Sequence, residues 1–202
     1  MRAAEVITWT RSAAARLLLN AGVSANAMTV LGLLGTVAGA VGFAARGQLL
    51  IATAIVTAGS LCDALDGMMA RLSGGGTRFG ALLDSASDRI GDGVIFTSLA
   101  FWPAGSGRPR AAAALCCLVA AYLVSYVRAR AEGLGVSGEI GIAHRYLRLK
   151  IAGVGALLGG LGLIWALEVT LWVLTALSTI TVAQRFVHAQ RQFHTSHSMH
   201  EG

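Results

Sequence analysis

Charged residues and prolines are scarce in this sequence of 202 residues. Charged residues account for 13% of the chain and hydrophobic residues for 55%, and the mean hydropathy is +0.66. This composition excludes an ordinary soluble domain and indicates an integral membrane protein. Only two prolines are present, and the 26 glycines lie mostly inside apolar runs, where small residues let helices approach closely in lipid. The pattern favours a tight helical bundle that forms one membrane domain over residues 1–202.

Cysteine is also rare. The three cysteines, Cys62, Cys116 and Cys117, lie in or beside apolar segments and show no CxxC or CxxH spacing. Their number and spacing therefore indicate neither a disulfide framework nor a zinc site. We interpret them as small packing residues.

The chain is basic, with a net charge of +6 and a pI near 10.0. The basic residues are strung between hydrophobic segments and form no soluble basic module, so we do not expect nucleic acid as a partner. We expect anionic headgroups of membrane lipids instead.

The N-terminal segment differs from a signal peptide. Its first 25 residues lack a clean apolar core followed by a small-residue cleavage site. Val6, Trp9, Ala13 and Leu17 instead recur at helical spacing, with arginines nearby. We expect residues 1–22 to form an amphipathic juxtamembrane helix that lies along the membrane surface.

Six further stretches approach the roughly 20 mainly apolar residues that a transmembrane helix needs. They cover about 28–46, 48–70, 80–102, 111–130, 150–167 and 169–187. The predicted fold is therefore all-α: a polytopic protein with a six-helix bundle over residues 23–187, followed by a polar tail over residues 188–202. We assign no role to the histidines of this tail. The polar stretch between Leu72 and Phe79, which contains three glycines, predicts a flexible loop at the membrane surface.

The distribution of basic residues predicts the orientation of these spans. If the N-terminus is cytoplasmic, only Arg46, Arg108 and Arg110 fall in the connections on the far side, and the rest of the 16 lysines and arginines face the cytoplasm. We expect a multi-pass protein of the plasma membrane whose second and third spans carry their carboxylates at the cytoplasmic interface.

The aspartates are clustered. All five of them fall within one window of 30 residues: Asp63, Asp66, Asp84, Asp88 and Asp92. Ionisable groups within membrane segments cost several kcal/mol unless they are paired, hydrated or metal-bound, so their default interpretation is functional. The first two aspartates are spaced i,i+3 and the next two i,i+4, so that each pair projects from a single helical face. Two such faces turned together form a cage of four carboxylates.

Oxygen ligands of this kind suit Mg²⁺ or Mn²⁺, and four crowded negative charges repel one another unless divalent cations neutralise them. Two metals can bind a diphosphate, stabilise charge on a leaving oxygen and activate an incoming hydroxyl. The alternative is that the aspartates cap helices or pair with Arg71, Arg78 and Arg89.

Small residues and an arginine follow the first pair of aspartates. Gly67 and Ala70 remove side-chain bulk beside the carboxylates, which lets a nucleotide lie against the helix. Arg71 then offers a forked donor for phosphate oxygens.

Eight residues of this window stand at fixed spacing: Asp63, Asp66, Gly67, Ala70, Arg71, Gly80, Asp84 and Asp88. The pattern resembles the complete signature of the CDP-alcohol phosphatidyltransferase family, DxxDGxxAR, eight residues, then GxxxDxxxD. The resemblance extends over nearly the whole chain, including six spans and the surface helix before them. It implies an enzyme that moves a phosphatidyl-type group from a CDP-linked lipid to an alcohol and releases CMP, and it implies a homodimer.

The resemblance also implies roles for individual residues. Asp63, Asp66 and Asp84 would be ligands of two magnesium ions, and Asp88 would be both a ligand and the general base. The CDP-lipid would be bound by the signature residues Gly67 and Arg71 and by a segment at the start of the first span: Asn26, Ala27, Met28 and Thr29. Thr77, in the segment GGGTRFG, matches another donor position of the family. Where the family usually has a proline before that segment, this sequence has Ala25.

Three segments carry a narrower resemblance: GGGTRFGALLDSASDRIGDG, SYVRARAEG and, in the first span, MTVLGLLG. In these segments the chain is most similar to actinobacterial members of the family whose acceptor is inositol 1-phosphate. A phosphorylated acceptor calls for fixed cations beyond those that serve the CDP-lipid. The candidate acceptor-binding residues are Arg128, Arg130, Arg145, Arg148 and Arg185. The positive-inside rule alone also places basic residues in these loops without any substrate.

Two alternative functions stay open. One is the same chemistry with another acceptor, such as glycerol 3-phosphate or free inositol. The other is a divalent-cation transporter, because intramembrane aspartates also mark ion pathways. Transport sites, however, lie near the bilayer midplane, often on broken helices in repeated halves, whereas these aspartates cluster at one interface without a repeat. The pattern therefore favours catalysis.

Overall fold

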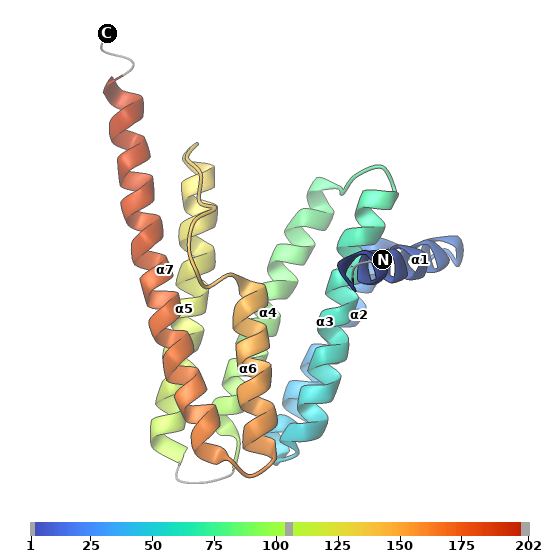
Figure 1. The fold of residues 1–202 in the computed structure, drawn as a ribbon, viewed down its shortest axis with the longest axis vertical. Helices are drawn as coiled ribbons and strands as arrows, with labels where there is room; N and C mark the ends of the chain where they lie inside the picture. The colour runs from blue at the N-terminus through green and yellow to red at the C-terminus, as the bar shows by residue number, and fades with distance from the viewer. Residues whose placement is uncertain (1–2, 104–106, 199–202) are drawn as a thin grey trace. The chain divides into compact units, whose positions relative to one another are not determined.

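The computed structural model describes residues 3–103 and 107–198. Within these residues the regular structure is entirely helical (Figure 1). The elements in chain order are α1 (Ala3–Asn20), α2 (Ala25–Gly42), a single 3-10 turn (Ala44–Arg46), α3 (Leu49–Leu72), α4 (Arg78–Phe101), α5 (Gly107–Gly133), α6 (Arg145–Gly160) and α7 (Ile164–Ser198). The prediction of an all-α fold is confirmed, and the first four apolar stretches correspond to the helices from α2 to α5. The fifth stretch, 150–167, was bounded wrongly, because α6 ends at Gly160 and α7 already begins at Ile164, before the sixth stretch.

The chain folds as two compact units, residues 1–98 and residues 99–202. The first unit contains α1, α2, α3 and most of α4. The second unit contains the end of α4 and all of α5, α6 and α7.

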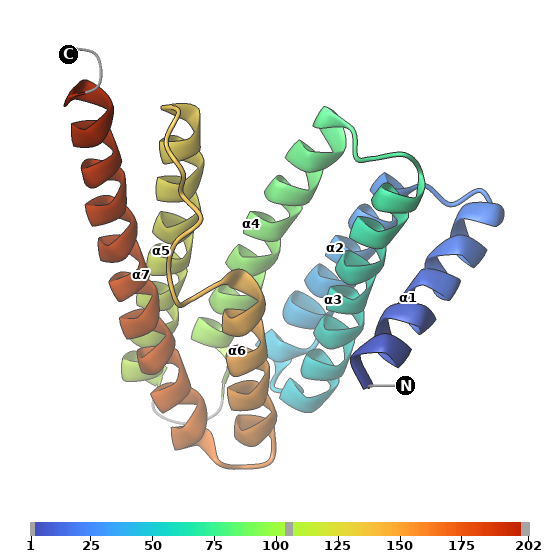
Figure 2. The ribbon, with the colours of Figure 1, turned by 45° about the horizontal axis from the view of Figure 1, so that its top comes forward.

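In the first unit, α2 and α3 pack side by side through glycines (Figure 2). A Cβ atom added to Gly59 of α3 would lie only 2.8 Å from the backbone oxygen of Gly32 in α2. Such a contact is too short for any residue with a side chain. The glycines inside the apolar runs therefore allow the close helix approach that the sequence predicted.

Helix α1 packs against this pair through one face. Ala15 has no exposed area and forms a small core with Met28 and Met69, to which Leu18 and Leu19 add partly buried side chains. The opposite side of α1 presents large apolar groups, since Trp9 and Leu17 are 65% and 70% exposed. An exposed apolar face suits the predicted position along a membrane surface.

Four helical segments in the described part of the chain are long and apolar enough to cross a membrane: Ala25–Arg46, Leu49–Leu72, Arg108–Gly133 and Ile164–His194. The prediction of six spans is thus confirmed only for these four segments. Helix α6 has 16 residues, fewer than the roughly 20 of a typical span, and three of its first six residues are basic. Helix α4 carries three aspartates and two arginines, which lower its hydropathy.

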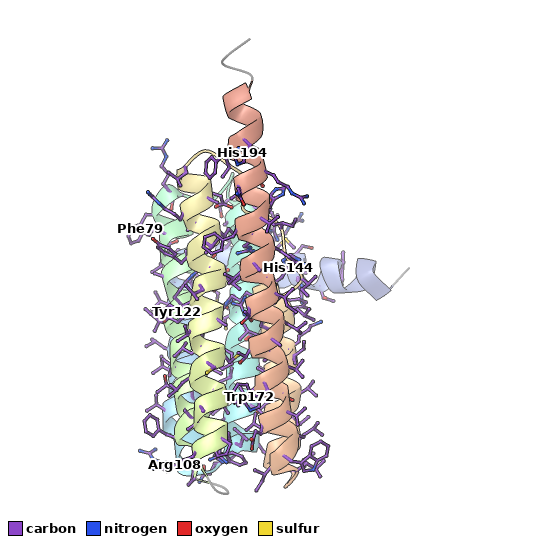
Figure 3. The ribbon with its side chains drawn as sticks, turned by 90° about the vertical axis from the view of Figure 1, so that its left-hand side faces the viewer. Phe79, Arg108, Tyr122, His144, Trp172 and His194 are labelled. Atoms are coloured by element: carbon purple, nitrogen blue, oxygen red, sulfur yellow. The ribbon has the colours of Figure 1, made fainter. Side chains whose placement is uncertain are left out.

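The second unit is organised around α7. Figure 3 shows α5 and α7 side by side, and α6 also packs against α7. One face of α7 points into the core, and its residues recur at helical spacing with no exposed area: Leu167, Leu171, Leu174, Ser178 and Thr181. Small side chains of α5, including fully buried Cys117, meet the core. Helix α7 continues to Ser198, beyond residue 187 where the last span was predicted to end.

Candidate active site

The first unit contains a cavity of about 520 Å³ beside the ends of α2, α3 and α4 and the turn between α3 and α4. Three aspartates from two helices line it, together with small and hydroxyl-bearing residues. The lining residues that the sequence singled out are Asn26, Thr29, Asp63, Asp66, Gly67, Ala70, Thr77, Gly80 and Asp84. Most of the eight-residue signature therefore surrounds one cavity, although its parts are separated in the sequence.

Asp66 is held in place by a neighbouring helix. Its side chain is buried, with 6% of its area exposed, and its Oδ2 atom accepts a hydrogen bond of 2.5 Å from the hydroxyl of Thr29. The same hydroxyl lies 3.2 Å from the carbonyl oxygen of Ala25. This hydrogen bond from α2 fixes the orientation of the Asp66 carboxylate on α3. The spacing of residues along α3 did not predict it.

The carboxylates also repel one another. The charges of Asp84 and Asp63 both act on Asp66, and like charges around a buried carboxylate are unfavourable unless cations offset them. All of these donors are carboxylate oxygens, which are the ligands that Mg²⁺ and Mn²⁺ prefer. The residues that line the cavity therefore fit divalent cations.

The carboxylates do not form a closed cage. Among the His, Cys, Asp and Glu side chains of residues 3–103 and 107–198, no group of three or more is assembled closely enough to hold a metal ion by itself. Asp63, Asp66 and Asp84 instead form an open arrangement around the cavity, with Asp84 exposed at its rim.

Asp88 lies one turn beyond Asp84 on α4 and is not among the residues that line the cavity. Its side chain is 18% exposed, and its Oδ2 atom lies 3.7 Å from Nη1 of Arg89. The roles of Asp88 as fourth ligand and general base stay predictions.

The predicted phosphate donor, Arg71, is not among the residues that line the cavity but lies beside Gly67, which does line it. A Cβ atom on Gly67 would lie 3.8 Å from Nη1 of Arg71, so the exposed guanidinium group stands over the glycine. Because residue 67 has no side chain, nothing at this position separates the cavity from the guanidinium group of Arg71.

The turn before α4 is closely packed. The hydroxyl of Thr77 accepts a hydrogen bond of 2.9 Å from the backbone N–H of Gly80 and so caps the first turn of α4. A Cβ atom on Gly80 would lie 3.0 Å from both Asn26 Oδ1 and Thr77 Oγ1. Glycine at this signature position therefore lets α4 approach the start of α2.

The predicted CDP-lipid segment at the start of α2 divides into two pairs. Asn26 and Thr29 line the cavity. Met28 instead packs in the core with Ala15 and Met69, and the backbone N–H of Ala27 donates to the side-chain oxygen of Ser24. Helical geometry turns the two pairs toward different surroundings.

The candidate acceptor residues all lie in the second unit, and three of them approach one another. The positive charges of Arg128 and Arg148 both act on Arg185. Arg148 and Arg185 are almost fully buried, with 2% and 5% of their areas exposed. Arg130 is exposed at the end of α5, and Arg145 is half-buried at the start of α6.

The sequence did not single out the acidic partners of this basic cluster. Arg128 donates to Glu132 over 2.8 Å and to Glu139 over 2.9 Å. The i,i+4 spacing of Arg128 and Glu132 was a signal for the first ion pair. Glu139 lies in the connection after α5, where spacing carries no such information.

Comparison with known proteins identifies the family. The family model for CDP-alcohol phosphatidyltransferase matches residues 22–183, and the chain belongs to this family. Among its relatives, phosphatidylinositol phosphate synthase of Mycolicibacterium smegmatis is 44% identical over 182 residues, which cover 88% of this chain and 82% of the relative. The synthase of Corynebacterium glutamicum is 40% identical over 178 residues, with 87% and 81% covered.

Solved structures of the Mycobacterium tuberculosis phosphatidylinositol phosphate synthase are also similar. The crystal structure with CDP-DAG bound has a TM-score of 0.81 and 40% sequence identity, and the match covers 89% of this chain and 92% of that one. The complex with manganese and citrate has a TM-score of 0.82 at the same identity and covers 89% and 88%. The chain is thus an enzyme of the phosphotransferase class.

Proposed function

We propose that this protein transfers the phosphatidyl group of CDP-diacylglycerol to inositol 1-phosphate, giving phosphatidylinositol phosphate and CMP. The observation that carries the proposal is the complete eight-residue signature, most of which surrounds one cavity. Relatives at about 40–44% identity that bear the name phosphatidylinositol phosphate synthase support the choice of acceptor.

We propose that Asp63, Asp66, Asp84 and Asp88 hold two divalent cations, Mg²⁺ or Mn²⁺. When bound, such ions supply charge neutralisation for the diphosphate of CDP-diacylglycerol and for its leaving oxygen. The support from this chain is the all-oxygen donor set and the repulsion between the carboxylates. The manganese bound by the Mycobacterium tuberculosis relative agrees with it.

Asp88 is the proposed general base. It takes the proton of the acceptor's hydroxyl group, whose oxygen forms a bond to the phosphorus of the phosphatidyl group. The bond from that phosphorus to the oxygen of CMP breaks. In transfers of this kind, most of the rate enhancement comes from correct positioning of the two substrates and from neutralisation of their charge.

The cavity of the first unit is the proposed site for the CDP group. Gly67 and Ala70 leave the wall of α3 without bulky side chains, and Arg71, whose guanidinium group lies beside Gly67, is the proposed donor to phosphate oxygens. Asn26, Thr29 and Thr77 add polar groups at the opposite wall. Ala27 and Met28, which were also predicted for this site, would contribute backbone and packing only.

The proposed site for the acceptor's phosphate group is the arginine cluster of the second unit. Arg128 and Arg148 both lie close enough to Arg185 for their positive charges to act on it, and a bound anion would offset this repulsion. Arg130 and Arg145 are the outer members of this proposed set.

The proposed enzyme is a homodimer of the plasma membrane with its active site on the cytoplasmic side. We propose that α4 and α6 cross the membrane in addition to the four apolar helices, and that α1 lies along the surface. The exposed apolar face of α1 and the position of most basic residues support this orientation.

The test is CMP release by purified protein supplied with CDP-diacylglycerol and Mg²⁺. Inositol 1-phosphate, free inositol and glycerol 3-phosphate are supplied in separate reactions. Release with inositol 1-phosphate alone is the expected result. Release with another acceptor would reject the proposed acceptor and retain the transfer chemistry, and no release with any of them would reject the function.

A further inference from the structure

The connection between α5 and α6, residues 134–144, is attached to both α5 and α7. We call it the α5–α6 loop, and Figures 1 and 2 show it running back along α5 toward the start of α6. Val136 is buried in a small core with Ala131 and Ala189. The side-chain amide of Gln192 on α7 pairs with the backbone of Ser137, accepting from its N–H and donating to its oxygen, each over 3.0 Å.

Thr181 of α7 holds the other end of this loop. Its hydroxyl accepts a hydrogen bond of 3.0 Å from the backbone N–H of Ala143, and both residues are almost completely buried. The loop also fits tightly here, because a Cβ atom on Gly141 would overlap Cγ2 of Thr181. Gly141 has a φ of +126°, a backbone conformation that favours glycine.

The backbone of the loop in turn orients two arginines. Nη1 of Arg148 donates to the carbonyl oxygen of Ala143 over 3.0 Å. Nε of Arg185 donates to the carbonyl oxygen of Ile140 over 2.8 Å, and its Nη1 donates to Val124 of α5. The backbone of Ala143 thus accepts a hydrogen bond from Arg148 at its carbonyl group and donates one to Thr181 from its N–H group.

We propose that Thr181 is a positioning residue for the acceptor's phosphate group: it fixes the α5–α6 loop at Ala143 so that Arg148 and Arg185 are held in a binding arrangement. This inference rests on the proposed function, since it assumes that the arginine cluster binds the acceptor. It adds a neutral, buried side chain that contacts neither substrate. A displaced loop alters guanidinium positions, and bidentate phosphate binding is sensitive to such changes.

The decisive variant is Thr181→Val. Valine keeps the shape and the methyl contact with Gly141 but leaves the buried N–H of Ala143 without its acceptor. We expect the KM for inositol 1-phosphate to rise about tenfold, with the KM for CDP-diacylglycerol and kcat changed less than about twofold. Thr181→Ser keeps the hydroxyl and is expected to restore the acceptor KM to within about twofold of wild type.

Thr179→Val is the matched control. Thr179 lies on the same helix, is exposed, and donates to the carbonyl oxygen of Thr175 within that helix. Its replacement is expected to leave all three kinetic constants unchanged. Should Thr181→Val fail to fold, Gln192→Met removes the second attachment of the loop, at Ser137, and is expected to raise the acceptor KM about threefold, with the exposed Gln190→Met as its control.

Three results would reject the positioning role. An acceptor KM that stays at the wild-type value in both Thr181→Val and Gln192→Met shows that the loop does not set acceptor binding. Equal changes in both KM values and in kcat, without rescue by serine, show a general structural defect. Wild-type protein that releases no CMP with inositol 1-phosphate rejects the proposed function itself, before any variant is compared.

Discussion

Asp66 and Asp88 differ in their surroundings although both belong to the signature. Asp66 is buried in the wall of the cavity and receives a hydrogen bond from Thr29. Asp88 lies farther along α4, beside Arg89 and outside the cavity lining. A fixed, buried carboxylate suits metal ligation, whereas a carboxylate that accepts a proton needs access to the acceptor's hydroxyl group.

Replacement of Asp88 by asparagine tests its role as the base. The amide has nearly the same shape but cannot take the proton, so we expect kcat for CMP release to fall at least about a hundredfold. Folding, measured by thermal unfolding in detergent, is expected to change little because the side chain is only partly buried. CMP release near the wild-type rate would reject the assignment.

Thr29 is expected to control metal affinity through Asp66. Thr29→Val removes the hydroxyl donor but keeps the side-chain shape, so that the carboxylate loses its fixed orientation. Partners of this kind typically change metal affinity by about ten- to a hundredfold, and we expect the Mg²⁺ concentration for half-maximal CMP release to rise about tenfold. Thr29→Ser serves as the control that keeps the hydroxyl, and an unchanged Mg²⁺ dependence in Thr29→Val would contradict the prediction.

At the scale of helices, hydropathy predicted where most of the six apolar elements lie, because an apolar run of sufficient length is a local property of the sequence. It did not predict that α7 continues to Ser198, since a polar helix lacks the apolar signal. Spacing placed Asp63 and Asp66 on one face of α3. It did not show that Thr29 meets Asp66 or that Thr181 meets Ala143, because these contacts join separate elements.

The close contact of α2 and α3 predicts that replacement by alanine lowers stability at Gly59 but not at Gly35. Gly59→Ala places a methyl group 2.8 Å from the backbone oxygen of Gly32, so the helices must separate. We expect a loss of about 1–3 kcal/mol in the free energy of unfolding, seen as a lower thermal midpoint in detergent. Gly35→Ala is the matched control, because its Cβ would meet only Gly59 at 3.9 Å. Equal thermal midpoints for the two variants would show that the helices can separate at this contact without loss of stability.

At the scale of the whole molecule, the number of membrane crossings decides which loops share a compartment. Four helical segments of the described chain are apolar enough to cross alone. With six crossings, the α5–α6 loop and the turn after α3 both face the cytoplasm. With four crossings, in which α4 and α6 do not span, the α5–α6 loop lies on the outer side and its arginines cannot serve a cytoplasmic acceptor.

Labelling of single introduced cysteines distinguishes these arrangements. Leu134, at the start of the α5–α6 loop, is 50% exposed, and Gln48, before α3, is also exposed. In intact cells, a membrane-impermeant maleimide is expected to label Gln48→Cys but not Leu134→Cys, and to label both after the cells are opened. The parent protein measures labelling of the native cysteines. Labelling of both variants in intact cells would mean that α4 does not cross, and would separate the arginine cluster from the cytoplasm.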